Sequence, residues 1–271
     1  GTFLFFNPFP HTTAIKEISF YLCLAIFLVL LVARKDSFLF RTPLSLPFLL
    51  FVVWSCLGLL FALNKANTFH DIYAHLLKYL FLFFMVSNFF DSKRRFSLLA
   101  WIFVVSATIF AVTTMTHDYV ILHRPFTDKL AAGFPETSPN IAGIITLFSV
   151  LLSFSLFSKR TPYLNVVLLL SLCLSAFATL ATQARSAVLA LIAAISAMFF
   201  PARKKTFVLI FVAVLVFAVP FLPVQNLFTP EAIMTKLKSD DRVRIWSCFA
   251  EIIKDHPVFG GGFGMQTCYD E

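Results

Sequence analysis

Long apolar runs separated by short polar segments dominate the chain. Most of these runs approach the roughly 20 residues that an α-helix needs to cross the roughly 30 Å hydrocarbon core of a bilayer. Because lipid offers no partner to a backbone N–H or C=O group, such a segment satisfies its hydrogen bonds internally, as a helix. The pattern predicts about eight spans, near residues 18–33, 43–63, 70–90, 97–116, 141–158, 166–183, 186–200 and 206–222. The predicted fold class is all-α, a polytopic transmembrane helical bundle.

The longest apolar stretch, residues 166–200, contains one charged residue, Arg185, and neither glycine nor proline. A single helix of this length would be about 52 Å long, far more than a bilayer needs. The flanking sequences are both basic, "SKR" before the stretch and "PARKK" after it. Both flanks therefore belong on one side of the membrane, and we expect the chain to cross twice, with a turn near residues 183–186. Arg185 is then expected at the external membrane surface, not at mid-bilayer, where a charge costs about 3 kcal/mol.

The distribution of charge supports this topology. The chain is 59% hydrophobic and 13% charged, with a mean hydropathy of +0.86 and a net charge of +8. Eleven lysines and arginines lie in the alternate loops 34–43, 91–96, 158–165 and 201–205. Four lie in the intervening loops 64–69, 117–140 and 184–185. The positive-inside rule places the first set in the cytoplasm. The basic balance is thus explained by topology, and no nucleic-acid partner is expected.

The chain divides into two parts by polarity. Residues 1–222 form the predicted transmembrane helical domain, and residues 223–271 start a large periplasmic loop. We expect a further span before Gly1 and a continuation of the loop beyond Glu271.

An extracytoplasmic amphipathic helix is predicted between Ser239, which can cap its first turn, and Pro257, which ends it. On a helical wheel, the apolar side chains nearest Arg242 are those of Trp246, Phe249 and Ile253, with Ile245 and Ile252 nearby. Arg244 lies on the opposite, polar face. Arg242 is therefore expected to point with the buried stripe, where a charge needs a partner. That partner is either a helix neighbour or a ligand.

The segment that follows, "HPVFGGGFG", is rich in glycine. It could form a backbone nest that binds anions, or it could be a flexible turn. Cys248 and Cys268 lie in the same predicted periplasmic loop and could pair, but sequence does not show the geometry that a disulfide requires.

Polar residues at the start of the third run, Asp71, His75 and Lys78, share one helical face. They could line a cavity or form a solvated face. With one histidine on this face and no matching ligand cluster elsewhere, the sequence predicts no metal site and no cofactor. Further along, Ser138 as N-cap and Pro139 at the first helical position are expected to start the span near 141–158.

Arg185 itself has two interpretations. It could snorkel to phospholipid headgroups and anchor the turn. The turn is, however, flanked by small residues, namely Ala181, Thr182, Ala184, Ser186 and Ala187. Small residues are typical of closely packed helices in membranes, and a guanidinium held there could bind a phosphate bidentately.

The order of these parts resembles the superfamily of O-antigen ligases and O-antigen polymerases, from about residue 40 onward. Those proteins carry an arginine at an external helix junction, matched here by "QARS" at residues 183–186. They then carry an extracytoplasmic segment of the form R-x-x-x-W followed by hP-x-x-G-x-G. The matching residues here are Arg242, Trp246, His256, Pro257, Gly260 or Gly261, and Gly262. An asparagine that opens a middle span is also usual, and here it is Asn140.

The resemblance implies a metal-independent membrane glycosyltransferase that moves a glycan from undecaprenyl pyrophosphate to a sugar hydroxyl of lipid A-core, on the periplasmic side. It implies that Arg185 and Arg242 hold the pyrophosphate. The residues considered as a further lining are Asn140, Gly261, Gly262 and His75. The catalytic histidine of the superfamily is expected beyond Glu271.

Other functions stay open from the sequence. Within the class, a lipid-linked glycan polymerase or a protein O-oligosaccharyltransferase would fit the same residues. From a different class, a lipid-linked glycan transporter or flippase is disfavoured, because transporters usually carry ionisable residues or broken helices near mid-membrane. The sugar, the acceptor and the oligomeric state are left open.

Overall fold

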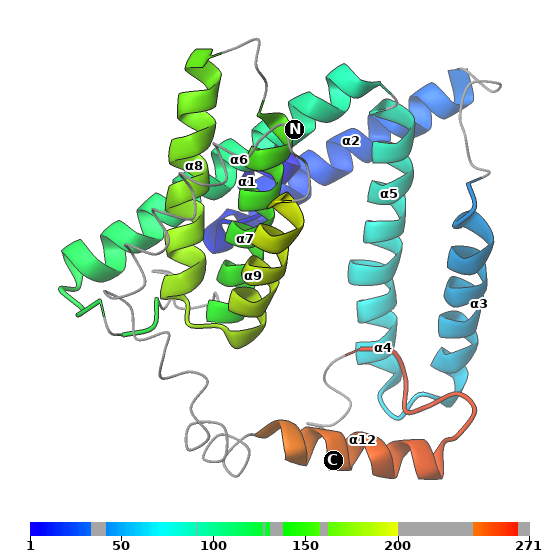
Figure 1. The fold of residues 1–271 in the computed structure, drawn as a ribbon. Helices are drawn as coiled ribbons and strands as arrows, with labels where there is room; N and C mark the ends of the chain where they lie inside the picture. The colour runs from blue at the N-terminus through cyan, green and yellow to red at the C-terminus, as the bar shows by residue number, and fades with distance from the viewer. Residues whose placement is uncertain are drawn as a thin grey trace. The chain divides into compact units, whose positions relative to one another are not determined.

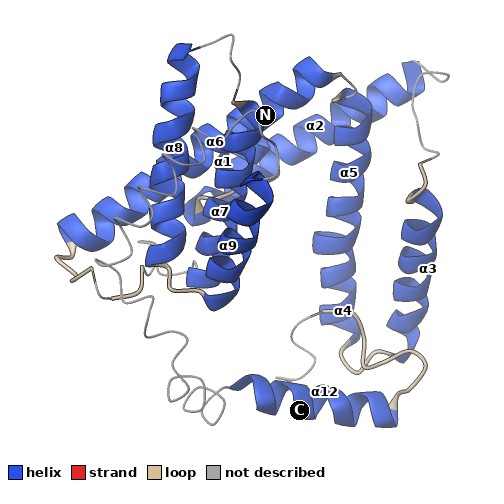
Figure 2. Cartoon of the chain, viewed as in Figure 1, coloured by secondary structure: helices blue, strands red, loops and turns tan. Residues whose placement is uncertain are grey.

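The structure is a computed structural model that describes residues 1–33, 42–90, 92–126, 128–130, 138–157, 162–199 and 241–264. Among these residues there are helices and turns and no strand (Figure 2). The predicted all-α class is therefore confirmed.

The helices follow the apolar runs of the sequence (Figure 1). They are α1 (Thr2–Phe6), η1 (Pro10–Thr12), α2 (Thr13–Ala33), α3 (Ser45–Phe61), α4 (Lys65–Asp71), η2 (Ile72–Leu77), α5 (Lys78–Phe89), α6 (Lys93–Met115), η3 (Thr116–Ile121), α7 (Pro139–Leu156), α8 (Pro162–Ala181), α9 (Arg185–Phe199) and α12 (Asp241–Asp255). The stretches η2 and η3 are π-helical and continue their neighbours without a break.

Five helical stretches in the described part of the chain are long and apolar enough to cross a membrane. They are Pro10–Ala33, Lys65–Phe89, Lys93–Ile121, Pro139–Leu156 and Pro162–Ala181. Two shorter apolar helices, Ser45–Phe61 and Arg185–Ala194, coincide with predicted spans. The protein is therefore a multi-pass membrane protein. The predicted count of eight is not confirmed, since the expected span 206–222 and the expected boundary at 222 lie outside the described residues.

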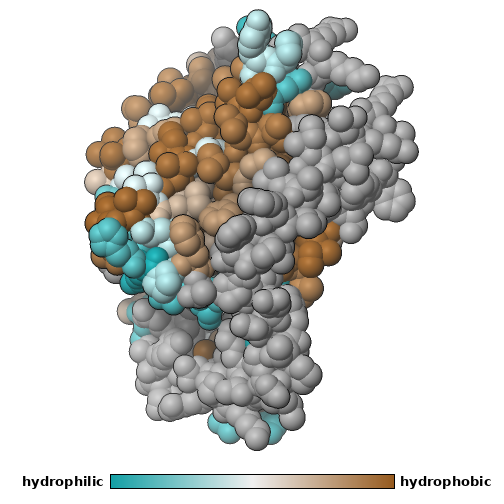
Figure 3. Space-filling view, turned by 60° about the vertical axis from the view of Figure 1, so that its left-hand side comes forward, coloured by the Kyte–Doolittle hydropathy of each residue, from teal (hydrophilic) through white to brown (hydrophobic). Residues whose placement is uncertain are grey.

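The exposed surface of the helices is apolar, as expected for a protein solvated by lipid. Among the described large hydrophobic side chains that are exposed are Ile18, Leu22, Val29, Leu46, Leu60 and Leu170. Brown, hydrophobic residues predominate over the described part of the face in Figure 3, and teal, hydrophilic residues gather toward its ends. Such a surface has no favourable contact with water, whereas acyl chains match it.

The chain forms two compact units. The first contains the described residues within 1–21 and 92–233, and the second those within 22–91 and 234–271. The helix α2 passes from the first unit to the second at Tyr21–Leu22.

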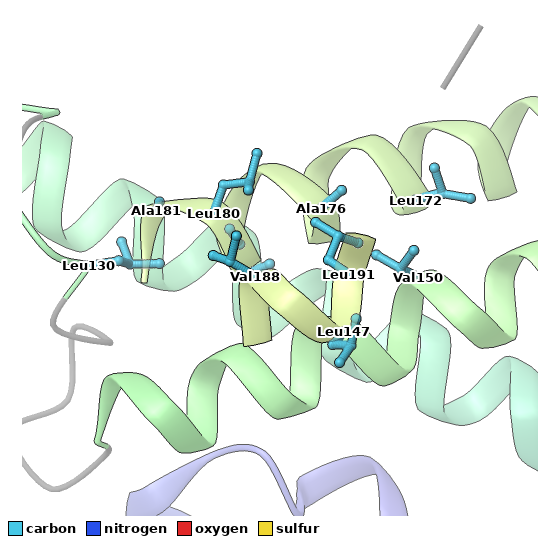
Figure 4. Close-up of a cluster of buried hydrophobic side chains, with 11 residues drawn as sticks. Leu130, Leu147, Val150, Leu172, Ala176, Leu180, Ala181, Val188 and Leu191 are labelled. Atoms are coloured by element: carbon cyan, nitrogen blue, oxygen red, sulfur yellow. The ribbon is translucent and has the colours of Figure 1, made fainter. Parts of the chain in front are cut away.

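The core of the first unit lies where α7, α8 and α9 meet beside α6 (Figure 4). Its buried residues are Ala111, Leu130, Leu147, Val150, Leu172, Ala176, Ala178, Leu180, Ala181, Val188 and Leu191. Small residues are frequent in this set, which lets the helix backbones approach one another closely.

A seam of hydroxyl groups joins α7 to α8 through this core. Thr146 Oγ1 lies 2.8 Å from Thr179 Oγ1, and Ser175 Oγ donates to Ser149 Oγ at 3.0 Å. In a membrane protein such interhelical hydrogen bonds contribute on average about 0.6 kcal/mol each. They also fix the register of α7 against α8, because a shift of one helix along the other would separate each buried hydroxyl from its partner.

The seam continues to the end of α8. Thr182 Oγ1 donates to the carbonyl of Thr179 at 2.7 Å, one residue before the chain turns. The packing of α7 on α8 therefore determines where the turn before α9 lies.

Candidate functional site

The turn between α8 and α9 consists of Thr182, Gln183 and Ala184, and α9 begins at Arg185. Gln183 adopts a φ of 52°, the left-handed conformation that commonly ends a helix. Its amide donates to the carbonyl of Leu180 at 3.0 Å. The prediction that residues 166–200 form two helices with a turn near Arg185 is thus confirmed.

Arg185 stands at the N-terminus of a helix of 15 residues. Its side chain is partly buried, whereas the residues next to it in the turn, Gln183 and Ala184, are buried. The first amides of a helix point away from it and carry a partial positive charge, so a helix N-terminus attracts anions. The guanidinium adds a full charge and a planar set of donors to that end. Together they suit a phosphate group.

Two neighbours hold the Arg185 turn in place. The amide of Leu130 donates to the carbonyl of Ala181 at 2.9 Å, which joins the predicted external loop 117–140 to the turn. On α7, Gly143 approaches the start of α9 so closely that a methyl group there would lie 2.9 Å from Cβ of Ala187 and 3.0 Å from Oγ1 of Thr182. The loop and the turn, both predicted to be external, therefore lie at one end of the first unit.

Asp118 is a polar residue near this end that the sequence analysis did not single out. Its side chain is 1% exposed, and Oδ1 lies 3.3 Å from Nδ1 of His117. It belongs to the π-helical end of α6, where Tyr119 packs against the core that contains Leu130 and Ala181. A charged residue where an apolar run ends, as in "THD", is the signal that could have drawn attention to it.

The helix α12 forms as predicted, from Asp241 to Asp255, but its buried face differs from the predicted one. Ile252 is buried, and Ile245 and Cys248 are partly buried. The predicted buried residues Trp246, Phe249 and Ile253 are 70%, 39% and 61% exposed. The prediction that these three side chains form the buried stripe is therefore wrong, whereas Ile252 and Ile245, which the helical wheel places near that stripe, are buried and partly buried. Apolar periodicity does not distinguish a face covered by protein from one that rests in a lipid headgroup region.

Among the two candidate arginines, only Arg185 has a described side chain, since the side chains of residues 241–244 lie outside the description. Arg185 belongs to the first unit and Arg242 to the second. Their convergence on one anionic site stays a prediction. The pairing of Cys248 with Cys268 also stays a prediction, because Cys268 lies outside the described residues.

The glycine-rich segment after α12 is fixed on the helices α3 and α4 of the second unit. The amide of Leu63 donates to the carbonyl of Gly261 at 3.0 Å. The ring of Phe259 stacks on Phe61, with centroids 4.4 Å apart, and on Trp54, with centroids 5.1 Å apart. The segment is therefore a turn that is packed on its neighbours, which neither alternative described, and anion binding by its backbone stays a prediction.

Two glycines of this segment lie where no side chain would fit. A methyl group on Gly262 would lie 2.5 Å from Oγ1 of Thr68, and one on Gly264 would lie 3.0 Å from Cγ of Asp71. Both glycines also have positive φ angles, 123° and 130°. Gly260 differs, since a methyl group there would meet nothing within 4 Å.

The polar face of α4 and η2 forms a cluster around Asp71. Oδ1 of Asp71 lies 3.4 Å from Nδ1 of His70 and 3.7 Å from Nε2 of His75. The Asp71 side chain is 19% exposed, against 67% for His70 and 60% for His75. Asp71 and His75 lie on one face as predicted, and His70 joins them. Of the two alternatives for this face, the exposed histidines fit the solvated one.

The remaining candidates are distributed over both units. Asn140 is exposed, next to Pro139 at the start of α7, where Ser138 caps the helix by accepting from the amide of Ile141 as predicted. Gly261 is buried. Within the described ranges no group of three His, Cys, Asp or Glu residues could hold a metal ion.

Comparison with known proteins gives one match. Residues 169–270 match a family model described as O-antigen ligase. The matched range includes Arg185, Arg242 and the glycine-rich segment. Neither the curated proteins nor the solved structures gave a match.

Proposed function

We propose that the chain, whose residues 169–270 match a family model described as O-antigen ligase, transfers a glycan from undecaprenyl pyrophosphate to a sugar hydroxyl of lipid A-core, on the periplasmic face of a bacterial inner membrane. The superfamily consists of glycosyltransferase-like enzymes that act on lipid-linked glycans and membrane lipids. The observation that carries the proposal is that one family match includes both the arginine at the α8–α9 turn and the segment after α12.

The proposed reaction does not require a covalent enzyme intermediate. Pyrophosphate is a stable leaving anion, so the protein mainly has to hold it, bring the acceptor hydroxyl to the anomeric carbon and stabilise the charge that develops as the bond breaks. Arg185, at the N-terminus of α9, provides a guanidinium and the positive end of a helix at one place. Arg242 is the second proposed pyrophosphate ligand. The proposed reaction uses no metal.

The position of the turn within the first unit supports binding at the membrane surface. The loop residue Leu130 and the α8 end are joined, so the proposed periplasmic loop 117–140 borders the Arg185 turn. A lipid-linked pyrophosphate lies at the height of the headgroups, because its polyprenyl chain stays in the bilayer. A helix N-terminus at the end of a span is at the corresponding height.

The test uses the full-length protein in cells that lack their own ligase. We expect glycan attached to lipid A-core, seen as a ladder of larger lipopolysaccharide species on gels and as an added glycan mass by mass spectrometry. Purified protein with undecaprenyl-pyrophosphate glycan and rough lipopolysaccharide should give the same product. The absence of product in both assays, at normal protein levels, would contradict the proposed function.

The same purified system separates the alternatives. A polymerase lengthens the glycan that remains on undecaprenyl pyrophosphate and leaves lipid A-core unmodified. A flippase moves labelled lipid-linked glycan across a vesicle membrane and changes the mass of neither lipid. We expect the acceptor mass to change.

A further inference from the structure

The glycines after α12 meet two polar residues of α4. Gly262 lies against Thr68, whose side chain is buried at 2% exposure, and Gly264 lies against Asp71. The nearest part of the Asp71 side chain to Gly264 is Oδ2, while Oδ1 faces the two histidines. The two oxygens of one carboxylate therefore contact different parts of the protein.

The close approach explains why glycine is required at these positions. A methyl group at position 264 would also lie 3.3 Å from Cβ of Asp71, and one at position 262 would lie 3.0 Å from Cβ of Ala62. Because Gly262 and Gly264 have no side chain, their backbone can lie directly against Thr68 and Asp71 of α4. The positive φ angles add a second cost to any residue with a Cβ.

The segment is also connected rigidly to α12. The amide of His256 donates to the carbonyl of Ile252 at 2.8 Å, and the amide of Gly260 donates to the carbonyl of His256 at 2.9 Å. The hydrogen bonds of α12 thus continue into the turn that leads to the glycines. Whatever fixes Gly262 and Gly264 fixes the end of the helix that carries Arg242.

Asp71 is itself held in place. It is the last residue of α4, directly before the π-helical stretch η2 that contains His75. Such stretches widen a helical turn and are frequent at functional sites. Nδ1 of His70 and Nε2 of His75 both lie within 4 Å of Oδ1. The carboxylate is therefore oriented from its own helix before the glycine segment meets it.

We propose that Asp71 is a positioning residue: with Thr68 it forms a seat for Gly262 and Gly264, which anchors α12 and so places Arg242 for the lipid-linked donor. The glycines of this segment then serve close packing on α4 and not an anion-binding nest. The effect on catalysis rests on the proposed function, whereas the packing of Gly262 and Gly264 on Thr68 and Asp71 is independent of it.

The seat is tested without any glycan. Thr68→Cys in a full-length, otherwise cysteine-free protein places a thiol under Gly262, where a maleimide reacts slowly while the segment is seated. Adding Gly264→Ala should raise the labelling rate about ten-fold or more, because local release exposes the buried position. Gly260→Asn is the matched control: its φ of 67° suits asparagine and nothing lies within 4 Å, so labelling should stay slow.

A second pair of variants tests whether Asp71 is the partner of Gly264. Asp71→Ala removes Oδ2 and Cγ, the two atoms that a methyl group at 264 would approach most closely, and leaves only Cβ at 3.3 Å. Gly264→Ala combined with Asp71→Ala should therefore label more slowly than Gly264→Ala alone. Such non-additivity is the sign of direct contact. Additive effects, or unchanged labelling in Gly264→Ala, would overturn the seat.

The consequence for the donor is measured in the purified system. Gly264→Ala should raise KM for undecaprenyl-pyrophosphate glycan about ten-fold, while kcat at saturating donor stays within a few-fold, since a displaced Arg242 weakens binding. Gly260→Asn should keep both values. A kcat loss at unchanged KM would overturn the route through Arg242. If the unmodified protein transfers no glycan while the labelling results hold, the proposed function fails and the seat stands.

Discussion

At the scale of residues, the environment of Arg185 determines what the guanidinium can do. It follows a turn whose hydrogen bonds end α8 cleanly, and it begins α9. The side chain follows a buried turn, and in the first turn of α9 Ser186 is exposed whereas Ala187 and Val188 are buried. Arg185 therefore starts from a closely packed part of the protein, which suits binding of a ligand better than anchoring in the lipid headgroups.

Arg185→Ala should lower glycan transfer by about 100-fold or more, because each donor to a developing charge contributes about 3–4 kcal/mol in a dry site. Arg185→Lys should recover little, since an ammonium keeps the charge but loses the planar fork. The measurement is initial transfer rate at matched protein levels. Nearly normal transfer by Arg185→Ala would assign this arginine to headgroup anchoring.

Arg242 and Arg244 should behave differently, although the exposed stripe of α12 removes the helical-face reason for it. Arg242 stands four residues before Trp246, as in the R-x-x-x-W pattern, and Arg244 has no counterpart there. At donor concentrations below KM, Arg242→Ala should lower transfer by about 100-fold because a charge-assisted hydrogen bond to the donor is lost. Arg244→Ala should stay within a few-fold, as exposed charges contribute about 0–1 kcal/mol. The reverse order would show that the wrong arginine was assigned.

At the scale of elements, close helix contacts place the site. The contact of Gly143 with Ala187 and Thr182 brings α7 against the first turn of α9. Cross-helix approaches of this kind depend on small residues, and a larger one must displace a backbone. The position of the Arg185 helix is therefore set partly from a residue more than 40 positions earlier in the sequence.

Gly143→Val should destabilise the protein by about 1–3 kcal/mol through overpacking and lower transfer as well, because the N-terminus of α9 must move. Ala190→Val, on the exposed face of the same α9, is the control and should change neither. Thermal unfolding in detergent, together with the transfer rate, measures both effects. Equal behaviour of the two variants would contradict the role of the Gly143 contact.

At the scale of the whole molecule, the sequence predicts helices better than it predicts contacts. Apolar runs gave the spans because lipid forces them to be helical, and length with charge placed the turn before Arg185. The seat of Gly264 on Asp71 joins residues far apart in the chain, which no local pattern encodes. The face of α12 that meets protein was also missed, because an apolar side chain fits lipid and protein equally well.

The membrane topology stays a prediction and has a direct test. Residues 91–96 and 201–205 should be cytoplasmic, and 117–140 and 223–271 periplasmic, from the charge balance of the loops. In a cysteine-free protein in intact spheroplasts, a membrane-impermeant maleimide should label Phe126→Cys and not Lys93→Cys. Labelling at position 93 would contradict the assigned orientation.

The hydroxyl seam between α7 and α8 has an evolutionary consequence. Thr146 and Thr179 are both buried, and each is the other's interhelical partner at 2.8 Å. Replacing one of them by an apolar residue removes the interhelical bond, about 0.6 kcal/mol on average, and leaves the other hydroxyl beside an apolar side chain with only the backbone of its own helix as a partner. Replacing both by residues of similar shape removes that mismatch. In related chains the two positions are therefore expected to covary: both keep a hydroxyl or both lose it. The same expectation holds for Ser149 with Ser175.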